Sequence, residues 1–399
     1  MTGNKITRYL MFAIVIFSPT FYFGAYAAGV LAFFILIKND VKAIADIMLK
    51  QKAIILMLIA LALSTLFSKV PGYSLLIDLV ILLHVMVYIV ILKWVNKENI
   101  EDIFRLLNAL GIMISIYGIY QYLTGDLNID KSWTDENTFG NLIRIYSTMR
   151  NPNMFAAYLT FNISYAVAYF IKKKADIYVA INIMLSSISL ILTYSRGGFF
   201  ALAGAMLFII IVSRELKVVY YLMIMVFLYY SYNFMQSTYR SDLSKLIIDS
   251  SSMYRVEIWK ASWKLFVENI LFGSGPGSVT KLLSYSSDKL KGVIMHSHNI
   301  PLYILSETGI FGLAAFAALL STEIKRFIRF WKKHRDSEYS FVALGFAAAI
   351  TAMLVHGMVD SAPLIPSRSL IFLIYLALFP ALHFNVFYNE AKDVPHFYK

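Results

Sequence analysis

The residues best suited to do chemistry are a few arginines and one histidine that stand beside apolar segments. Arg150 and His298 each stand just before such a segment, and Arg196 lies in a tight Tyr-Ser-Arg-Gly-Gly reversal between two others. Arg255 lies in a long stretch that separates two apolar segments. Arginine presents a planar fork of N–H donors that suits phosphate oxygens, and histidine is a natural general base toward a hydroxyl group. Together these residue types indicate a site for an anionic lipid headgroup.

Each of these residues also has a purely structural interpretation. Arg196 can be an interfacial anchor, because arginine often snorkels at helix ends, although the two glycines after it favour a tight turn that leaves room for a ligand. Arg240 can be a solvated loop charge, and Arg255 can stack on a nearby tryptophan. His298 can be a hydrogen-bonded structural residue, and Asp360 can cap a helix or pair with an arginine. The arginines, His298 and Asp360 taken together therefore indicate a function more clearly than any one of them does.

The composition indicates that membrane helices position these residues. Of the 399 residues, 59% are hydrophobic and 15% are charged, whereas soluble domains contain about 25% charged residues. The chain has no cysteine, which excludes disulfides, thiolate metal sites and a cysteine nucleophile. It also lacks an Asp-x-Asp pair and the Walker A, HExxH and GxSxG motifs. These absences argue against a nucleotide-sugar enzyme, an ATPase, a zinc protease and a serine hydrolase.

We expect an all-α polytopic membrane protein with about twelve transmembrane helices. A span needs roughly 20 apolar residues, and the first apolar segment is too long for one helix. It contains Ser18, Pro19 and Thr20 near its middle, so we predict that it reverses there and crosses twice. The candidate segments are 9–37, 53–68, 72–92, 106–123, 153–171, 177–194, 197–213, 218–231, 300–322, 339–359 and 367–387.

Basic residues in the loops predict the orientation. The loop 323–338 carries six lysines and arginines, so we assign it to the cytoplasm. Alternating outward from it also assigns 172–176, 214–217, 93–105 and 38–52 to the cytoplasm, with both termini. The formal charge of +12 then mostly reflects the basic residues that orient the chain in the membrane. It does not indicate that the protein binds nucleic acid. The arginines and His298 fall on the outer side of a bacterial inner membrane.

Two longer loops fall on that outer side, at 124–152 and 232–299. We therefore divide the chain into a first membrane block (1–231, about nine spans), a large outer loop (232–299) and a C-terminal membrane block (300–399, three spans). Within the large loop, residues 253–270 repeat apolar side chains at spacings of three and four, which predicts an amphipathic helix. Its Trp259 and Trp263 suit a membrane surface.

Four short motifs follow one another along the chain. They are Arg150-Asn151-Pro152-Asn153; Tyr194-Ser195-Arg196-Gly197-Gly198; Arg255, three residues and Trp259, leading to Gly273-Ser274-Gly275-Pro276-Gly277; and His298-Asn299, nine residues, Gly309, two residues and Gly312. Their order, the spans and the large loop before the histidine resemble the bacterial O-antigen ligase and O-antigen polymerase family. The resemblance covers most of the chain, is densest over 140–320, and implies a C-type membrane glycosyltransferase fold.

The resemblance implies a glycosyltransferase that needs neither metal nor cofactor. The donor would be a glycan on undecaprenyl diphosphate, and the acceptor a sugar hydroxyl on a lipid A core or on another lipid-linked glycan. Arg196 and Arg255 would hold the diphosphate, with Arg150 and Arg240 as further candidates. His298 would act on the acceptor hydroxyl. The supporting residues would be Asn299, Asp360 and Asn153.

Two other classes of function compete with glycosyl transfer. A transporter, such as a flippase of lipid-linked oligosaccharide, would also need many spans and a basic phosphate site. It would more often show broken helices, polar groups at the midplane and a repeat between its halves, and no clear repeat is evident. A non-catalytic assembly or lipid-sensing protein would leave the histidine among arginines without a purpose. Ligase and polymerase are not distinguished by the sequence.

Overall fold

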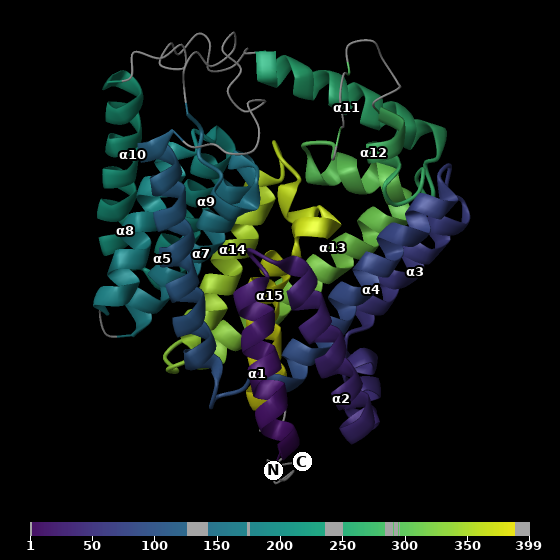
Figure 1. The fold of residues 1–399 in the computed structure, drawn as a ribbon, viewed down its shortest axis with the longest axis horizontal. Coiled ribbons are helices and arrows are strands. Elements are labelled where there is room, and N and C mark those ends of the chain that lie inside the picture. The colour runs from purple at the N-terminus through teal and green to yellow at the C-terminus, as the bar shows by residue number, and fades with distance from the viewer. Residues whose placement is uncertain are drawn as a thin grey trace.

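A computed structural model describes residues 2–125, 143–173, 176–235, 250–283, 290, 294 and 296–387. Throughout these residues the regular structure is helical, and no strand occurs among them. Figure 1 shows most helices running in one general direction, with α11 lying across one end of the bundle. The predicted all-α class of a polytopic membrane protein is confirmed for the described part of the chain.

The helices follow the apolar segments closely. The N-terminal set is α1 (Thr2–Phe17), α2 (Tyr22–Lys50), α3 (Lys52–Leu66), α4 (Pro71–Trp94) and α5 (Ile100–Thr124). The central set is η2 (Ser147–Met149), α7 (Pro152–Lys172), α8 (Ile177–Leu192), α9 (Arg196–Ser213), α10 (Lys217–Met235), α11 (Ser250–Glu268) and α12 (Ser278–Leu282). The C-terminal set is α13 (Ile300–His334), α14 (Ser340–His356), η4 (Ala362–Leu364), η5 (Pro366–Arg368), α15 (Leu370–Leu382) and η6 (His383–Phe387).

Five of these helices are long and apolar enough to cross a membrane, namely α4, α5, α7, α9 and α13. The pair α2 and α3, bent by 81° at a short break, makes a sixth if it is counted as one span. Shorter apolar helices occur at Ile6–Phe17, Ile177–Leu192, Lys217–Tyr229, Ser340–His356 and Leu370–Val386. The total of twelve spans and the division into three blocks stay predictions.

The first apolar segment breaks where its Ser-Pro-Thr sequence predicts. α1 ends at Phe17 and α2 begins at Tyr22, and α1 packs against α2 (Figure 1). The Ser18 hydroxyl donates to the Val15 carbonyl at 2.9 Å, which satisfies one of the carbonyls that a helix end leaves free. The N-terminal segment is therefore two helices.

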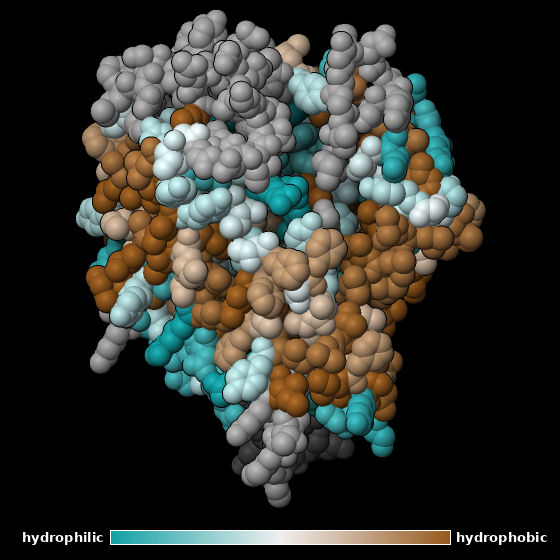
Figure 2. All heavy atoms as spheres, viewed as in Figure 1, coloured by the Kyte–Doolittle hydropathy of each residue, from teal (hydrophilic) through white to brown (hydrophobic). Residues whose placement is uncertain are grey.

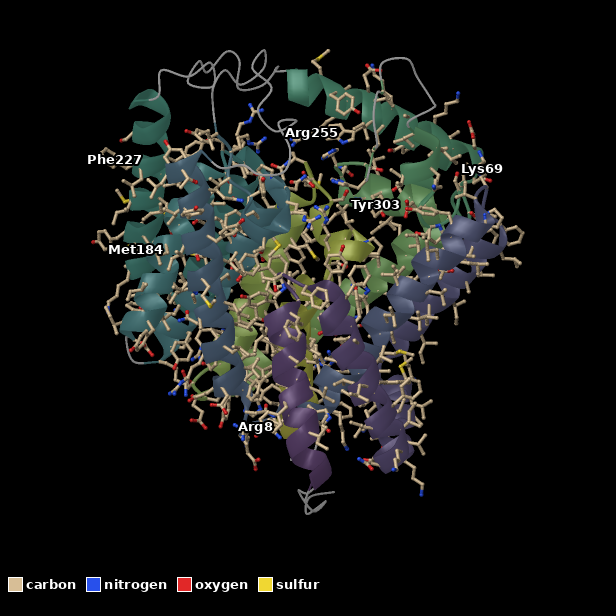
Figure 3. All side chains as sticks on the ribbon, in the orientation of Figure 1. Arg8, Lys69, Met184, Phe227, Arg255 and Tyr303 are labelled. Atoms are coloured by element: carbon tan, nitrogen blue, oxygen red, sulfur yellow. The ribbon has the colours of Figure 1, made fainter. Side chains whose placement is uncertain are left out.

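The segments predicted to share the cytoplasmic side do gather at one end of the molecule. Three ion pairs connect them, namely Arg8–Asp102 (2.8 Å), Lys93–Asp40 (2.9 Å) and Lys173–Glu101 (2.5 Å). Figure 3 shows Arg8 at this end and Arg255 at the opposite one. Two of these segments are mostly not loops: α13 continues as a helix to His334 through 323–338, and α2 continues to Lys50 through 38–52. Which end faces the cytoplasm stays a prediction.

The side surface of the bundle is apolar, as a lipid environment requires. Large hydrophobic side chains such as Met184, Ile211 and Phe227 are more than half exposed. Figure 2 shows apolar residues gathered along the sides of the bundle. In a soluble monomer, such a surface would be an aggregation hazard. Its extent supports membrane embedding.

The core of the bundle is organised around α7, whose apolar window is 89% buried. α8, α9 and α14 pack against it (Figure 1). Buried amides join it to its neighbours: Asn162 Nδ2 donates to Asn182 Oδ1 at 2.8 Å, and Asn182 Nδ2 donates to Asn108 Oδ1 at 2.8 Å. Hydrogen bonds between helices hold membrane bundles together where hydrophobic association is weak. This network fixes α5, α7 and α8, two of which lead to the site described below.

α11 forms where the amphipathic pattern predicts a helix, but the face that it buries differs from the predicted stripe. Ile258 and Ser262 are fully buried, and the helix packs against α13. Trp263, which we placed on the apolar face, is 52% exposed. The helix therefore uses one face for the protein and leaves a tryptophan on its surface.

α13 is broken at Gly309, which has φ 66° and ψ −164°. The segment around Gly273 supplies partners for the interrupted backbone. Four hydrogen bonds join the two segments: Ser274 N to Ser306 O (2.9 Å), Gly275 N to Glu307 O (2.9 Å), Ile310 N to Ile270 O (2.9 Å) and Phe311 N to Leu271 O (3.3 Å). Irregular backbone at membrane depth is tolerated where protein satisfies it. The glycine-rich motif thus acts as a backbone bridge to α13.

Replacing Gly309 with alanine should destabilise the protein. Its backbone conformation is essentially restricted to glycine and costs about 1–3 kcal/mol for other residues, and an added Cβ would lie 2.3 Å from the Leu271 carbonyl oxygen. We expect a lower melting temperature in detergent than for the wild type. Gly72→Ala is the matched control, because nothing lies within 4 Å of a Cβ there. Equal melting of Gly309→Ala and wild type would contradict this view of the break.

Candidate active site

The turn that carries Arg196 is built by its own side chains and by close packing. Tyr194 has a positive φ of 51°, and the Ser195 hydroxyl caps α9 by accepting from Gly198 N at 3.3 Å. A Cβ on Gly197 would lie 2.8 Å from Cδ2 of His356, and one on Gly198 would lie 2.7 Å from the Ala156 Cβ. The two glycines therefore make room for neighbouring side chains, and Arg196 becomes the first residue of α9.

Asn153, in the first turn of α7, connects this turn to the rest of the site. Asn151 caps α7 by accepting from Asn153 N (2.8 Å) and Met154 N (3.1 Å). The Asn153 Oδ1 accepts from Arg144 Nη2 (3.2 Å) and from the Ser195 hydroxyl (3.1 Å), while its Nδ2 donates to Asp360 Oδ2 (3.0 Å). One amide therefore joins an arginine, the α9 turn and a carboxylate.

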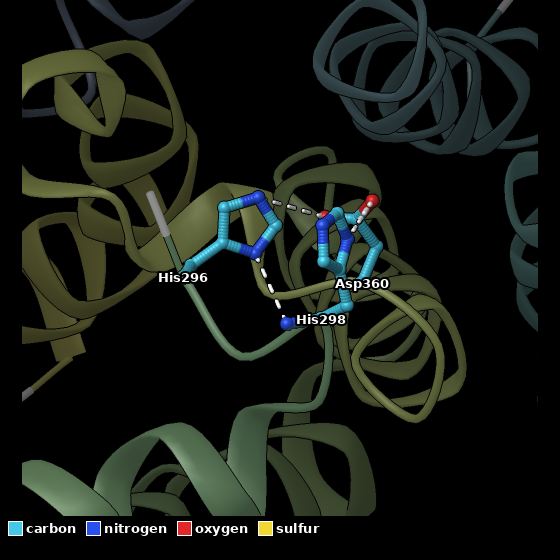
Figure 4. Close-up of side chains that lie close together, drawn as sticks. All are labelled: His296, His298 and Asp360. Carbon is cyan, nitrogen blue, oxygen red and sulfur yellow. Dashed lines mark hydrogen bonds and ion pairs between the residues drawn. The ribbon is translucent and has the colours of Figure 1, made fainter. Parts of the chain in front are cut away.

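His298 pairs with Asp360 at the entry to α13. Their Nδ1 and Oδ2 atoms are 3.2 Å apart, as Figure 4 shows. Asn299 caps α13 by accepting from Leu302 N (2.9 Å), and its Nδ2 donates to the Met358 carbonyl (3.0 Å). This bond ties the histidine loop to the loop that carries Asp360. His298 has a positive φ of 50°, a strained conformation that often occurs at functional sites.

His296 supports the His298 loop from inside. Its Nδ1 accepts from the backbone N of His298 at 3.2 Å and lies 2.9 Å from the Ser361 hydroxyl. Because a backbone N–H can only donate, Nδ1 must be unprotonated, and the neutral ring carries its proton on Nε2. That nitrogen faces Asp360 Oδ1 at 3.7 Å (Figure 4). Burial and the neighbouring His298 lower the pKa of His296 to about 3, so His296 stays neutral at physiological pH.

Asp360 is a buried carboxylate, 2% exposed. Burial alone would raise its pKa, but the adjacent histidines and the hydrogen bond from His298 hold the pKa well below its ordinary value. The carboxylate is therefore ionised at neutral pH. The proton between Asp360 and His298 then lies on Nδ1 of His298, which leaves Nε2 as its free basic nitrogen. The His298 side chain is 23% exposed, so a substrate can reach it.

A small polar cavity of about 20 Å³ lies between these elements. Its lining residues are Arg144, Asn153, Tyr194, Ser195, Arg196, Gly197, Arg255, His356, Val359 and Asp360. Three arginines and one carboxylate among these residues leave a positive excess that suits an anion. The volume is near that of one water site, which is smaller than a diphosphate group.

The structure brings together most of the residues that the motifs singled out. Arg196, Arg255, Asn153 and Asp360 line one cavity, and His298 contacts Asp360. Arg150 stands apart: it is exposed, has a φ of 56°, and is not among the cavity's lining residues. Arg240 lies outside the described residues.

Three residues of the site were missed by sequence reasoning as functional candidates. Arg144 is 7% exposed, lines the cavity and donates from Nε to the Thr193 carbonyl at 3.0 Å. His296 and His356 are also buried there. A signal was present for Arg144, because it stands alone in the apolar run Leu-Ile-Arg-Ile-Tyr. Nothing in the sequence indicates that His356 reaches the same cavity.

His296, His298 and Asp360 also resemble a metal-binding set. One ligand atom from each lies within 4.8 Å of the others, and two histidines with a carboxylate suit several divalent metals. Nδ1 of His296 is already used by the His298 backbone, and the cavity beside Asp360 carries three arginines that disfavour a further cation. That the site works without a metal stays a prediction, and the effect of a chelator on activity can test it.

Comparison with known proteins identifies a family match within the chain. No curated protein matches the chain at a significant level. Residues 181–317 match the family model described as O-antigen ligase. The matched region contains Arg196, Arg255 and His298, and the structure adds Asn153 and Asp360 from outside it. The predicted resemblance to the O-antigen ligase family is therefore confirmed over residues 181–317.

Proposed function

We propose that the chain moves a glycan from undecaprenyl diphosphate to a sugar hydroxyl at the outer face of the bacterial inner membrane. The match of residues 181–317 to the O-antigen ligase family model supports a role in polysaccharide assembly. The observation that carries the finer proposal is the convergence of three arginines on one cavity beside a histidine paired with a buried carboxylate. The acceptor is a lipid A core for a ligase, or another lipid-linked glycan for a polymerase.

In the proposed reaction, His298 acts as the base and the arginines neutralise the leaving group. Asp360 holds the Nδ1 proton of His298, so Nε2 takes the proton from the acceptor hydroxyl. The hydroxyl oxygen attacks the anomeric carbon, the bond from that carbon to the diphosphate oxygen breaks, and its electron pair stays on the diphosphate. Arg196 and Arg255 stabilise this charge as it develops. A direct displacement inverts the anomeric centre.

The remaining residues have supporting roles in this proposal. Arg144 and Asn153 hold the arginine cluster in register with Asp360. Asn299 fixes the His298 loop through its bond to the Met358 carbonyl. Arg150, exposed near the electropositive Arg368, attracts the diphosphate before it reaches the cavity. Arg240 belongs to the same set of candidates.

The test uses the purified full chain in lipid, a defined undecaprenyl-diphosphate oligosaccharide, and a chelator. Chelator-resistant transfer is expected. A ladder of products from the lipid-linked glycan alone would indicate a polymerase, and a single addition that needs a lipid A core would indicate a ligase. Transfer that stops with chelator and returns with a divalent ion would make His296, His298 and Asp360 a metal centre. Donor binding without transfer to either acceptor would favour a transporter.

The proposed orientation can be tested by cysteine labelling, because the chain has no cysteine of its own. Lys264 on α11 and Lys333 on α13 are both exposed. We expect Lys264→Cys to react with an impermeant maleimide in intact cells, and Lys333→Cys to react only after permeabilisation. The reverse pattern would put the candidate site on the cytoplasmic side and overturn the proposed donor geometry.

A further inference from the structure

His356 is a buried imidazole that the proposed mechanism does not use. It is the last residue of α14, is 1% exposed, and lines the cavity of Arg196, Arg255 and Asp360. Its Nδ1 has no hydrogen-bond partner among the described residues. An unpaired polar atom in a protein interior is costly, and most buried polar groups have a partner. A ligand in the cavity is a natural partner for this ring.

The surrounding backbone is shaped around the His356 ring. A Cβ on Gly197 would lie 2.8 Å from Cδ2 and 3.1 Å from Nε2 of His356, so only glycine lets the ring lie against the first turn of α9. The residue after His356 is tied to the start of α13, because Ile300 N donates to the Gly357 carbonyl at 2.7 Å. The ring therefore lies against the arginine turn, and the backbone beside it is fixed to the start of α13.

We propose that His356 contacts the bound donor by donating a hydrogen bond from its imidazole to a phosphate oxygen. This inference rests on the proposed function and adds a residue to its donor site. His298 already faces Asp360 and serves the acceptor, whereas the His356 ring lies against Gly197, directly after Arg196. A neutral N–H donor beside arginines adds a directed hydrogen bond without adding charge.

Three variants test this contact through binding of undecaprenyl diphosphate to the full chain in nanodiscs. Asparagine can replace Nδ1 as a donor, glutamine can replace Nε2, and phenylalanine keeps the ring shape but cannot donate. We expect His356→Phe to weaken binding about tenfold or more, as for a hydrogen bond to a charged group. One of the two amide variants should stay within about threefold of wild type, and the other should weaken like phenylalanine. Wild-type affinity in all three variants would overturn the contact.

Two controls separate this contact from folding and from the proposed function. His383→Phe alters another partly buried histidine, at the opposite end of the bundle near Arg326 and Arg329, and should bind normally. If the wild type does not bind undecaprenyl diphosphate, the proposed function fails. If the wild type binds and the His356 variants bind equally well, only this inference fails. If His356→Phe does not fold, the difference in binding between His356→Asn and His356→Gln tests the contact instead.

A double-mutant cycle tests the role of Gly197. Gly197→Ala should weaken diphosphate binding by displacing the His356 ring. In a His356→Ala background the ring is absent and only the close approach to the Val359 side chain, at 2.9 Å, remains, so the same substitution should cost less. Neighbouring residues that act through one contact are expected to be non-additive. An equal cost of Gly197→Ala in both backgrounds would show that the glycine does not act through His356, and would remove that support from the proposal.

Discussion

Replacing His298 with alanine should lower the rate of glycosyl transfer by about 10²–10⁴-fold, the range for removal of a general base, while donor affinity changes little. The reason is the division of labour in the site: His298 pairs with Asp360 at 3.2 Å, whereas the arginines line the neighbouring cavity. Removing the imidazole therefore removes the base and leaves the anion site. Single-turnover transfer and donor binding, measured on the same preparation, separate the two effects.

Asp360→Asn is the companion variant. An asparagine cannot hold the Nδ1 proton of His298 as a carboxylate does, and it favours the wrong tautomer. We expect a loss of similar size, and no further loss when both substitutions are combined, because residues that act as a unit are strongly non-additive. His334→Ala, in the last turn of α13 at the opposite end, is the matched control. Near-normal transfer by His298→Ala would remove the histidine from the chemistry.

Local pattern was sufficient to predict the helices and part of the site. Apolar length predicted where most of the helices form, and the Ser-Pro-Thr sequence predicted the break between α1 and α2. Asn299 was recognised beside His298 through the family motif, which is itself a short local pattern. Asp360 was recognised as a charge at a helix end. These inferences depend on a few consecutive residues, which is the range over which periodicity and capping operate.

The rest of the site depends on contacts between distant segments. Arg144 reaches the cavity only because Thr193 and Asn153 receive its guanidinium, and neither partner can be read from the residues around it. The same holds for the glycine-rich motif, whose segment bonds to the interrupted backbone of α13. A local reading shows that this motif breaks the chain, but only the tertiary structure shows what the break contacts. Packing of α11 against α13 likewise determines that Trp263 lies on the exposed side of α11.

Lysine in place of Arg196 or Arg255 should lower kcat/KM by about tenfold to 100-fold, although the charge is conserved. Hydrogen bonds to charged groups contribute about 1.5–3 kcal/mol each, and an ammonium cannot reproduce the planar fork of a guanidinium. Both arginines line the cavity beside Asp360. Arg329→Lys, an exposed site on α13 far along the helix from His298, should leave activity unchanged.

The two lysine variants also distinguish a shaped anion site from a generally positive surface. If fixed arginine forks stabilise the leaving diphosphate, the loss should appear mainly in kcat and should persist at low ionic strength. If the arginines only attract the donor, each lysine variant should approach wild-type rates at low salt, where charge attraction is strongest, and the loss should appear in KM. Full activity of both variants at physiological salt would contradict a role for Arg196 and Arg255 in holding the diphosphate.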